Sequence, residues 1–282
     1  MRLLPGRRCA RPGCPWNGKI RMTVPSSLFD QYERQARWRP VAATVQQLGP
    51  LEGKKVADLG CGSGHVARMF AARGAQVTGI DRDAELVALA ARKAPGVHWV
   101  NADLSDPGTW GRSGFDIIWS SFTIAYAPDP TTWLKRWHAA LAPGGRLILM
   151  DVGGLLDHEP IGEADRETIG HFCREAAQAG LYHFDAAERL VDWLEASGFD
   201  VLGETDLHDE ELTFTGPAPP DVLAAWAARL ARMPRLRAAA SPGFTDRFLA
   251  SLTHPDHRSH SRVRAAIGRR GRDAGRWAAR GA

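Results

Sequence analysis

An acid followed by three glycines at alternate positions restricts how this chain can fold more than any other feature. The segment reads Val56-Ala57-Asp58-Leu59-Gly60-Cys61-Gly62-Ser63-Gly64-His65, so an apolar run ends at the acid and enters the glycines. Glycine permits the positive φ of a tight strand-to-helix turn, and without Cβ atoms a ligand can lie directly on the backbone at the helix N-terminus. The segment therefore predicts a strand, a ligand-binding turn and a helix.

Two further acids lie where the next strands are expected to end. Asp81 comes 23 residues beyond Asp58, and an acid at this spacing in nucleotide-binding folds accepts the hydroxyls of a ribose. Asp103 can accept the exocyclic amine of an adenine. A single loop acid is usually solvated, but three at neighbouring strand ends indicate a nucleoside site. A dinucleotide fingerprint needs a third glycine at position 65, where this chain has His65.

Apolar strands alternate with Ala-rich amphipathic helices around these acids, as in a parallel sheet with crossover helices. We expect strands at 55–59, 76–80, 98–101, 115–120, 146–151 and 199–204, with a seventh near 211–215. Helices are expected at 26–38, 40–48, 64–73, 83–93, 131–141 and 186–197. The predicted fold class is α/β: a Rossmann-like, seven-stranded, mostly parallel sheet with helices on both faces, plus a helical cap and a C-terminal appendage.

The chain is predicted to have three parts. Residues 1–25 form a disordered tail, with Met22 as an alternative start, and residues 26–216 form the ligand-binding domain, with a polar, helix-prone cap insertion at 152–184. Residues 217–282 form a helical appendage with a mobile basic end. Cys9 and Cys14 are interpreted as free thiols of the tail, although their spacing would also suit half a zinc site.

Charge and hydropathy narrow the class of protein. No stretch reaches the ~20 apolar residues of a membrane span, and the Arg-rich start lacks the apolar core of a signal peptide, so a cytoplasmic location is expected. The net charge is +4, and residues 226–282 carry thirteen arginines against three acids. A basic end can bind nucleic acid or can balance an acidic middle domain. The second reading is favoured because arginine is preferred over lysine throughout the chain and Trp277 is almost alone among the arginines of the end as a stacking aromatic.

Together, these motifs resemble those of the class I S-adenosylmethionine-dependent methyltransferases, in particular the small-molecule branch similar to ubiquinone-biosynthesis methyltransferases. The resemblance covers about 29–215. It rests on the glycine motif at 58–64, Asp81, Asp103, the segment 115–121 with Pro128-Asp129 beyond it, and the segment 141–147.

The resemblance implies S-adenosylmethionine as cofactor, S-adenosylhomocysteine as product and no metal. Ser120 and Ser121 would lie beside the methionine moiety, and Tyr32 would close over the cofactor. The cofactor-binding set it implies is Tyr32, Asp58, Gly60, Cys61, Gly62, Gly64, His65, Asp81, Arg82, Asp103, Leu104 and Ser120. The chain lacks an Asn/Asp-Pro-Pro-Tyr motif at 120–123, which disfavours methylation of a nucleobase, and its 124–126 loop lacks the histidine that relatives often carry there.

The expected function is methyl transfer to a small metabolite of secondary-metabolite or cofactor type, by in-line displacement. His158, His171 and His183 in the insertion are candidate general bases, each of which could equally be a surface or packing histidine. The six acids and two arginines of 152–184 predict a neutral or cationic acceptor. Two alternatives stay open, an RNA or protein methyltransferase that uses the basic ends and an accessory protein that binds the cofactor without methylating. The sequence does not fix the oligomeric state.

Overall fold

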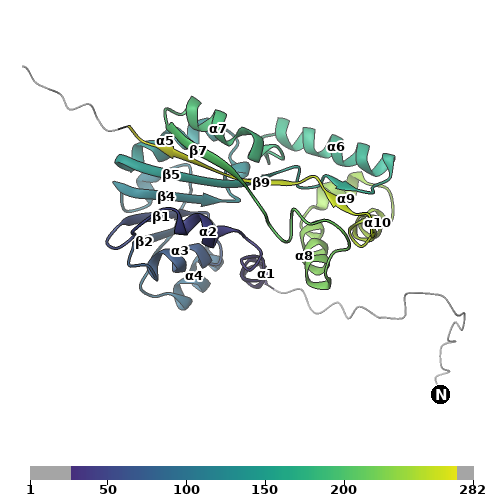
Figure 1. The fold of residues 1–282 in the computed structure, drawn as a ribbon, viewed down its shortest axis with the longest axis horizontal. Coiled ribbons are helices and arrows are strands. Elements are labelled where there is room, and N and C mark those ends of the chain that lie inside the picture. Colours follow the sequence, from purple (N-terminus) through teal and green to yellow (C-terminus); the bar gives the residue numbers. More distant parts are fainter. Residues whose placement is uncertain (1–26, 272–282) are drawn as a thin grey trace, which may run out of the picture.

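The fold is a seven-stranded sheet covered by helices, with a group of further helices beyond one end of its strands (Figure 1). The computed structural model describes residues 27–271. The strands of the sheet are β1 (Lys55–Leu59), β2 (Gln76–Asp81), β3 (His98–Asn101), β4 (Phe115–Ser121), β5 (Leu141–Gly153), β7 (Asp200–Leu207) and β9 (Arg262–Arg269). Their order is β3-β2-β1-β4-β5-β9-β7, in which β9 runs antiparallel to both neighbours and β1 to β5 pair in parallel. The predicted α/β class and mostly parallel sheet are confirmed.

The helices alternate with the strands as expected. They are α1 (Leu28–Gln35), α2 (Val41–Gln46), α3 (His65–Ala71), α4 (Ala84–Lys93), α5 (Pro130–Ala140), α6 (Glu163–Gln178), α7 (Ala186–Ala196), α8 (Pro220–Ala231), α9 (Pro234–Ala239) and α10 (Phe244–Leu252). Two short 3-10 turns, η1 (Pro107–Thr109) and η2 (Ile124–Tyr126), and a two-stranded ribbon of β6 (His158–Glu159) and β8 (Arg258–Ser259) complete the described chain. Side-chain caps begin several helices; Asp83, for example, accepts the N–H groups of Glu85 and Leu86 at the start of α4.

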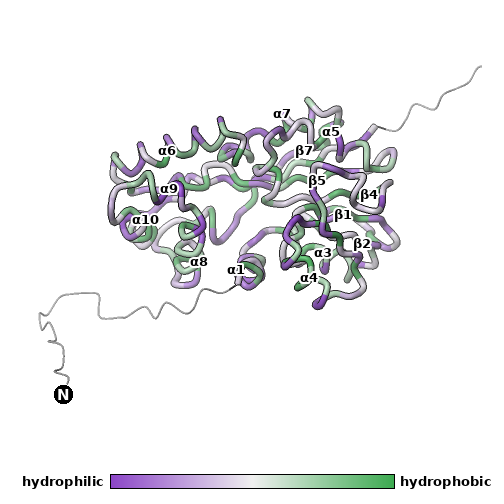
Figure 2. The backbone as a smooth tube through the Cα atoms, turned by 180° about the vertical axis from the view of Figure 1, so that it is seen from behind, coloured by the Kyte–Doolittle hydropathy of each residue, from purple (hydrophilic) through white to green (hydrophobic). Residues whose placement is uncertain are grey.

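Alternate residues of the central strands enter two cores, one on each face of the sheet. Ile117 and Trp119 of β4 pack on one face with α2 and α3, whereas Ile118 packs on the other with α5 and α7. This division follows from the period of two along a strand. Figure 2 shows hydrophobic colouring along the inner strands, while α6 is largely hydrophilic.

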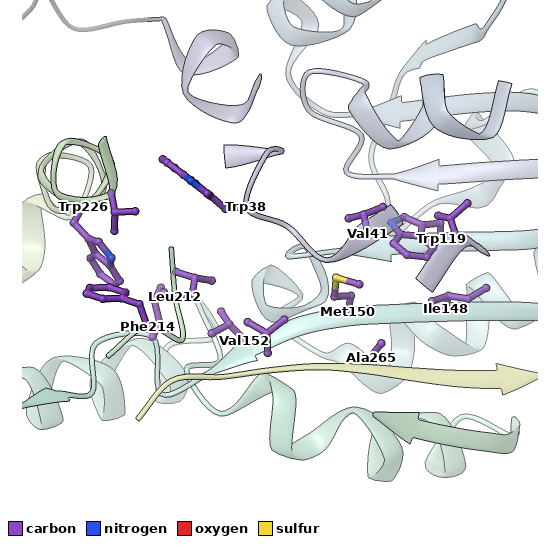
Figure 3. Close-up of a cluster of buried hydrophobic side chains, with 14 of the residues drawn as sticks. Trp38, Val41, Trp119, Ile148, Met150, Val152, Leu212, Phe214, Trp226 and Ala265 are labelled. Carbon is purple, nitrogen blue, oxygen red and sulfur yellow. The ribbon is translucent and has the colours of Figure 1, made fainter. Parts of the chain in front are cut away.

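The first of these cores continues from the sheet into the C-terminal helices. Figure 3 shows Trp38, Leu212 and Phe214 between the sheet residues and Trp226 of α8, which is fully buried. The C-terminal helices therefore share one core with the sheet, and the tight packing of large apolar side chains fixes their position.

The prediction for the seventh strand is wrong. Residues near 211–215 form a loop, and the strand that completes the sheet is β9, drawn from the segment expected to be an appendage with a mobile end. Val263, Ala265 and Ala266 are buried, and β9 pairs with β5 and β7 along its length. The arginines that flank these small residues hid the strand, because Arg262, Arg264 and Arg269 lie at alternating or terminal positions and pair with acids of β7.

Two further predictions concern membrane spans and the N-terminal tail. Within residues 27–271, no helix is long and apolar enough to cross a membrane. The predicted tail and its cysteines, Cys9 and Cys14, lie outside the described residues, so the zinc alternative stays untested.

Candidate functional site

The glycine turn between β1 and α3 has the geometry expected from the sequence. Gly60, Gly62 and Gly64 all have positive φ, at 70°, 52° and 75°, and Gly64 caps α3. A Cβ on Gly60 would overlap Thr123 and one on Gly64 would overlap Trp99. Each position therefore requires glycine, both for its backbone conformation and for space.

The acids at the ends of β1 and β2 lie on either side of this turn. Asp81 accepts the Gly62 N–H at its Oδ2 (2.8 Å) and the Asp83 N–H at its Oδ1 (3.0 Å), so it ties the turn to β2. Each carboxylate oxygen keeps a further lone pair for a ligand. Asp58 is buried beneath the turn, and its Oδ2 has no hydrogen-bond partner within the described chain. Burial raises the pKa of Asp58 to about 7.

A cavity of about 640 Å³ begins at the glycine turn and reaches α1, α6, α8 and α9. It opens at the carboxyl ends of β1 and β4, where the strand order reverses, which is the ligand crevice of open α/β sheets. Seven of the expected cofactor residues line it, namely Tyr32, Gly60, Cys61, Gly62, His65, Asp81 and Arg82. The volume falls in the range of small-molecule sites.

The other expected cofactor residues do not line the cavity. Ser120 is buried, with Ser121 in the wall instead, and Leu104 is buried in the core that contains Trp137. Asp103 is exposed and accepts the Ser105 N–H (2.7 Å), and this bond lowers its pKa. Gly64 and Asp58 belong to the same turn and strand but are not among the residues that line the cavity.

The structure does not bring the three candidate bases to the cavity. His158 is buried, with its Nδ1 3.0 Å from Nε2 of His257, and burial lowers the pKa of His158 to about 3. His183 is buried against the Ala127 carbonyl (Nε2 to O, 3.1 Å), and His171 is exposed beside Glu175. Among the described histidines, His65 alone lines the cavity.

The insertion 152–184 reaches the cavity with apolar and aromatic side chains. Its lining residues are Val152, Leu155, Phe172, Ala176, Leu181, Tyr182 and Phe184. Its acids lie elsewhere; Asp165, for example, pairs with Arg247 at 2.7 Å. The predicted acidic lid is therefore wrong as a description of the cavity. Asp157 and Glu159 precede α6, and none of the acids of 152–184 is among the cavity-lining residues.

Sequence reasoning missed the outer wall of the cavity. Tyr126 and Tyr182 meet edge to face, with ring centroids 4.8 Å apart, and Arg229, Arg232 and Arg235 of α8 and α9 lie in the same wall. Tyr126 is half exposed, whereas burial raises the pKa of Tyr182 well above its usual value. The arginines at 229 and 232 are spaced i, i+3, which places them on one helix face. Because the whole segment is rich in arginine, this spacing cannot be told from that of a solvated basic tail.

A family model for a methyltransferase domain matches residues 31–204, which include the glycine turn, both strand-end acids and β1 to β5. The chain belongs to this methyltransferase family.

Named relatives agree with this assignment. The chain is 36% identical over 203 residues to a trans-aconitate 2-methyltransferase of Streptomyces avermitilis, covering 66% of this chain and 74% of the relative. It is 27% identical over 167 residues to a ubiquinone biosynthesis O-methyltransferase of Coxiella burnetii, covering 58% and 71%. Among solved structures, the [4+2]-cyclase SpnF has a TM-score of 0.57 at 22% identity, covering 84% and 82%, which shows the fold alone.

The chain is therefore an S-adenosylmethionine-dependent methyltransferase. The residues present fit the cofactor. The glycine turn leads into the N-terminus of α3, Asp58 offers an unpaired buried carboxylate oxygen, and Asp81 lies at the end of the neighbouring strand.

Proposed function

We propose that the inner half of the cavity holds S-adenosylmethionine and that its outer half holds a small metabolite of secondary-metabolite or cofactor type. The observation that carries this proposal is a single cavity that runs from the glycine turn to the wall of α6, α8 and α9. Asp81 would accept the ribose hydroxyls, Asp58 would meet the ammonium group directly or through water, and Asp103 would accept the adenine amine from the rim.

When bound, S-adenosylmethionine supplies a methyl group on a cationic sulfur. The side chains of this protein contribute alignment and exclusion of water rather than covalent chemistry. Tyr32 lies over the turn, so that a Cβ on Gly62 would come within 3.0 Å of its ring. Tyr126, Tyr182 and Phe172 enclose the outer half. Both tyrosine hydroxyls are protonated at neutral pH, so each would be able to donate a hydrogen bond to the acceptor.

Methyl transfer is tested by incubating the protein with S-adenosylmethionine labelled at the methyl group and a metabolite extract. We expect label in small, chromatographically discrete products. Label in RNA or protein fractions would support the alternative that uses the basic ends. Cofactor binding without label in any fraction would support an accessory role, which the fold does not exclude because one fold serves many functions. The cytoplasmic location expected from the sequence, and the absence of a nucleic-acid partner, stay predictions.

Replacing Asp81 by Ala should weaken the binding of S-adenosylhomocysteine by about 1.5–3 kcal/mol, the usual cost of losing charge-assisted hydrogen bonds. Titration calorimetry measures the change. Asp106→Ala is the matched control, since Asp106 also accepts a loop N–H, that of Gly108, but lies outside the cavity wall. Equal affinities of the Asp81 variant and the wild type would contradict the ribose assignment.

Cofactor binding should depend on pH through Asp58. Its pKa of about 7 in the free protein means that the carboxyl is largely protonated at pH 6 and ionised at pH 8. Because an ammonium group pairs with the ionised form, S-adenosylhomocysteine should bind about tenfold more weakly at pH 6 than at pH 8. Calorimetry across this interval checks the slope, and Asp58→Asn should flatten it. A profile in the variant as steep as in the wild type would remove Asp58 from this role.

A further inference from the structure

We propose that the acceptor carries an anionic group, a carboxylate or a phosphate, and that Arg229 and Arg232 hold it at the outer wall of the cavity. This inference rests on the proposed function, since it names the class of molecule that the outer half of the cavity takes. Guanidinium groups bind the oxygens of both anions in paired hydrogen bonds.

Part of the positive charge on the outer wall has no acidic partner in the described chain. Within residues 27–271, no carboxylate lies within salt-bridge distance of Arg232 or Arg235. The Arg232 guanidinium instead donates to the Gln31 side chain and to the Ala228 carbonyl. Arg232 is exposed at one side, and partial burial and the nearby Arg229 charge lower its pKa. An anion between the two guanidinium groups would offset the repulsion between them.

A buried ion cluster holds the other arginines of the wall in place. Glu211 is fully buried and accepts from Arg39 at 2.7 Å and from Arg229 at 2.6 Å, while Asp209 accepts from Arg39 at 2.6 Å. Two acids and two arginines balance within this cluster. The Nε of Arg229 is nevertheless buried without a partner in the described chain. It is a fixed hydrogen-bond donor beside Arg232, which has no carboxylate partner there.

The charges of Arg229 and Arg232 act on aromatic side chains that line the cavity. Arg229 and Arg232 each lower the pKa of Tyr32 and of Tyr126, against the larger effect of burial. The guanidinium groups therefore act inside the same enclosure as the cofactor turn that Tyr32 covers. Aromatic and apolar side chains such as Phe172 and Phe184 also line the outer half, so the acceptor has an apolar body as well as an anionic end. This replaces the neutral or cationic acceptor expected from the acids of 152–184.

The test uses matched probes that differ in charge. The full-length protein, with and without saturating S-adenosylhomocysteine, is titrated with phenylacetate, with phenylacetamide and with phenyl phosphate. At least one anion should bind about tenfold or more tightly than the amide. The preferred anion tells a carboxylate site from a phosphate site.

Arg232→Gln should reduce the affinity for the preferred anion to within about threefold of that for the amide, while the affinity for S-adenosylhomocysteine changes less than threefold. Arg237→Gln is the matched control, because Arg237 is exposed on α9, bonds the Ala231 carbonyl and lies outside the wall; it should bind the anion as the wild type does.

Three results would overturn the inference: anions that bind no better than the amide, an Arg232 variant that keeps full anion affinity, or one that loses S-adenosylhomocysteine affinity to the same extent. The last result would assign Arg232 to the cofactor. Failure of the wild type to bind S-adenosylhomocysteine would instead refute the proposed function, and the titrations without it would still decide whether the arginines bind an anion.

Discussion

A chain that ends at Ser261 should fail to fold to the native state. It lacks β9, so β5 and β7 lose the strand that pairs with both, and the apolar surface that Val263, Ala265 and Ala266 cover becomes exposed. The buried edge of β5 would be left with unpaired backbone groups, each costly to leave without a partner. We expect no cooperative thermal transition by circular dichroism, together with aggregation in size-exclusion chromatography.

The matched control is a chain that ends at Gly271, which keeps β9 complete. It should melt within a few degrees of the full chain, since it holds all the strands of the sheet. A cooperative, wild-type-like transition in the chain that ends at Ser261 would mean that β9 is dispensable and would contradict the sheet order reported above.

Replacing Glu211 by Ala should lower the free energy of unfolding by about 3–5 kcal/mol, the cost of breaking a buried ion pair and leaving its partners uncompensated. The carboxylate of Glu211 accepts from Gln35, Arg39 and Arg229, and the variant leaves two guanidinium groups with Asp209 alone. Urea denaturation at pH 7 measures the change. Asp200→Ala is the control, because Asp200 pairs with Arg269 in an exposed bridge, which contributes about 0–1 kcal/mol.

The difference between wild type and the Glu211 variant should shrink in acid. Burial acts to raise the pKa of Glu211, but the charges of Arg229 and Arg39 outweigh it and hold the pKa below its usual value. A lowered pKa contributes stability that is present above the unfolded-state pKa of about 4.5 and is lost as the pH falls through the native value. A constant difference from pH 7 to pH 3 would show that packing, and not charge, accounts for the loss.

The sequence predicted the cofactor half of this protein well, because its signals are local. The strands at 55–59 and 98–101 agree with β1 and β3 at both ends, and the glycine turn leads into α3 as expected. Each depends on a few adjacent residues, namely an apolar run, an acid and glycines with positive φ.

The acceptor half could not be predicted in this way, because it is assembled from distant segments. Arg39 and Glu211 meet across more than 170 residues of sequence, and their pairing leaves no periodic signal. The histidines of 152–184 had the right chemistry for a base, but the backbone turns two of them into the core and one toward solvent. The strand β9 was missed because arginines that pair with β7 acids interrupt its apolar residues.

The place of β9 in the sheet also sets an order for folding during synthesis. The strands β1 to β5 can pair as they leave the ribosome, because each joins a neighbour already made or the next one along the chain. The strand β7 cannot, since the position beside β5 belongs to residues 262–269, which are translated about 60 residues later. Until then the nascent chain presents an open edge at β5, the kind of surface on which strands of other chains add. The cofactor turn can thus be complete while the edge of β5 is still open to other chains.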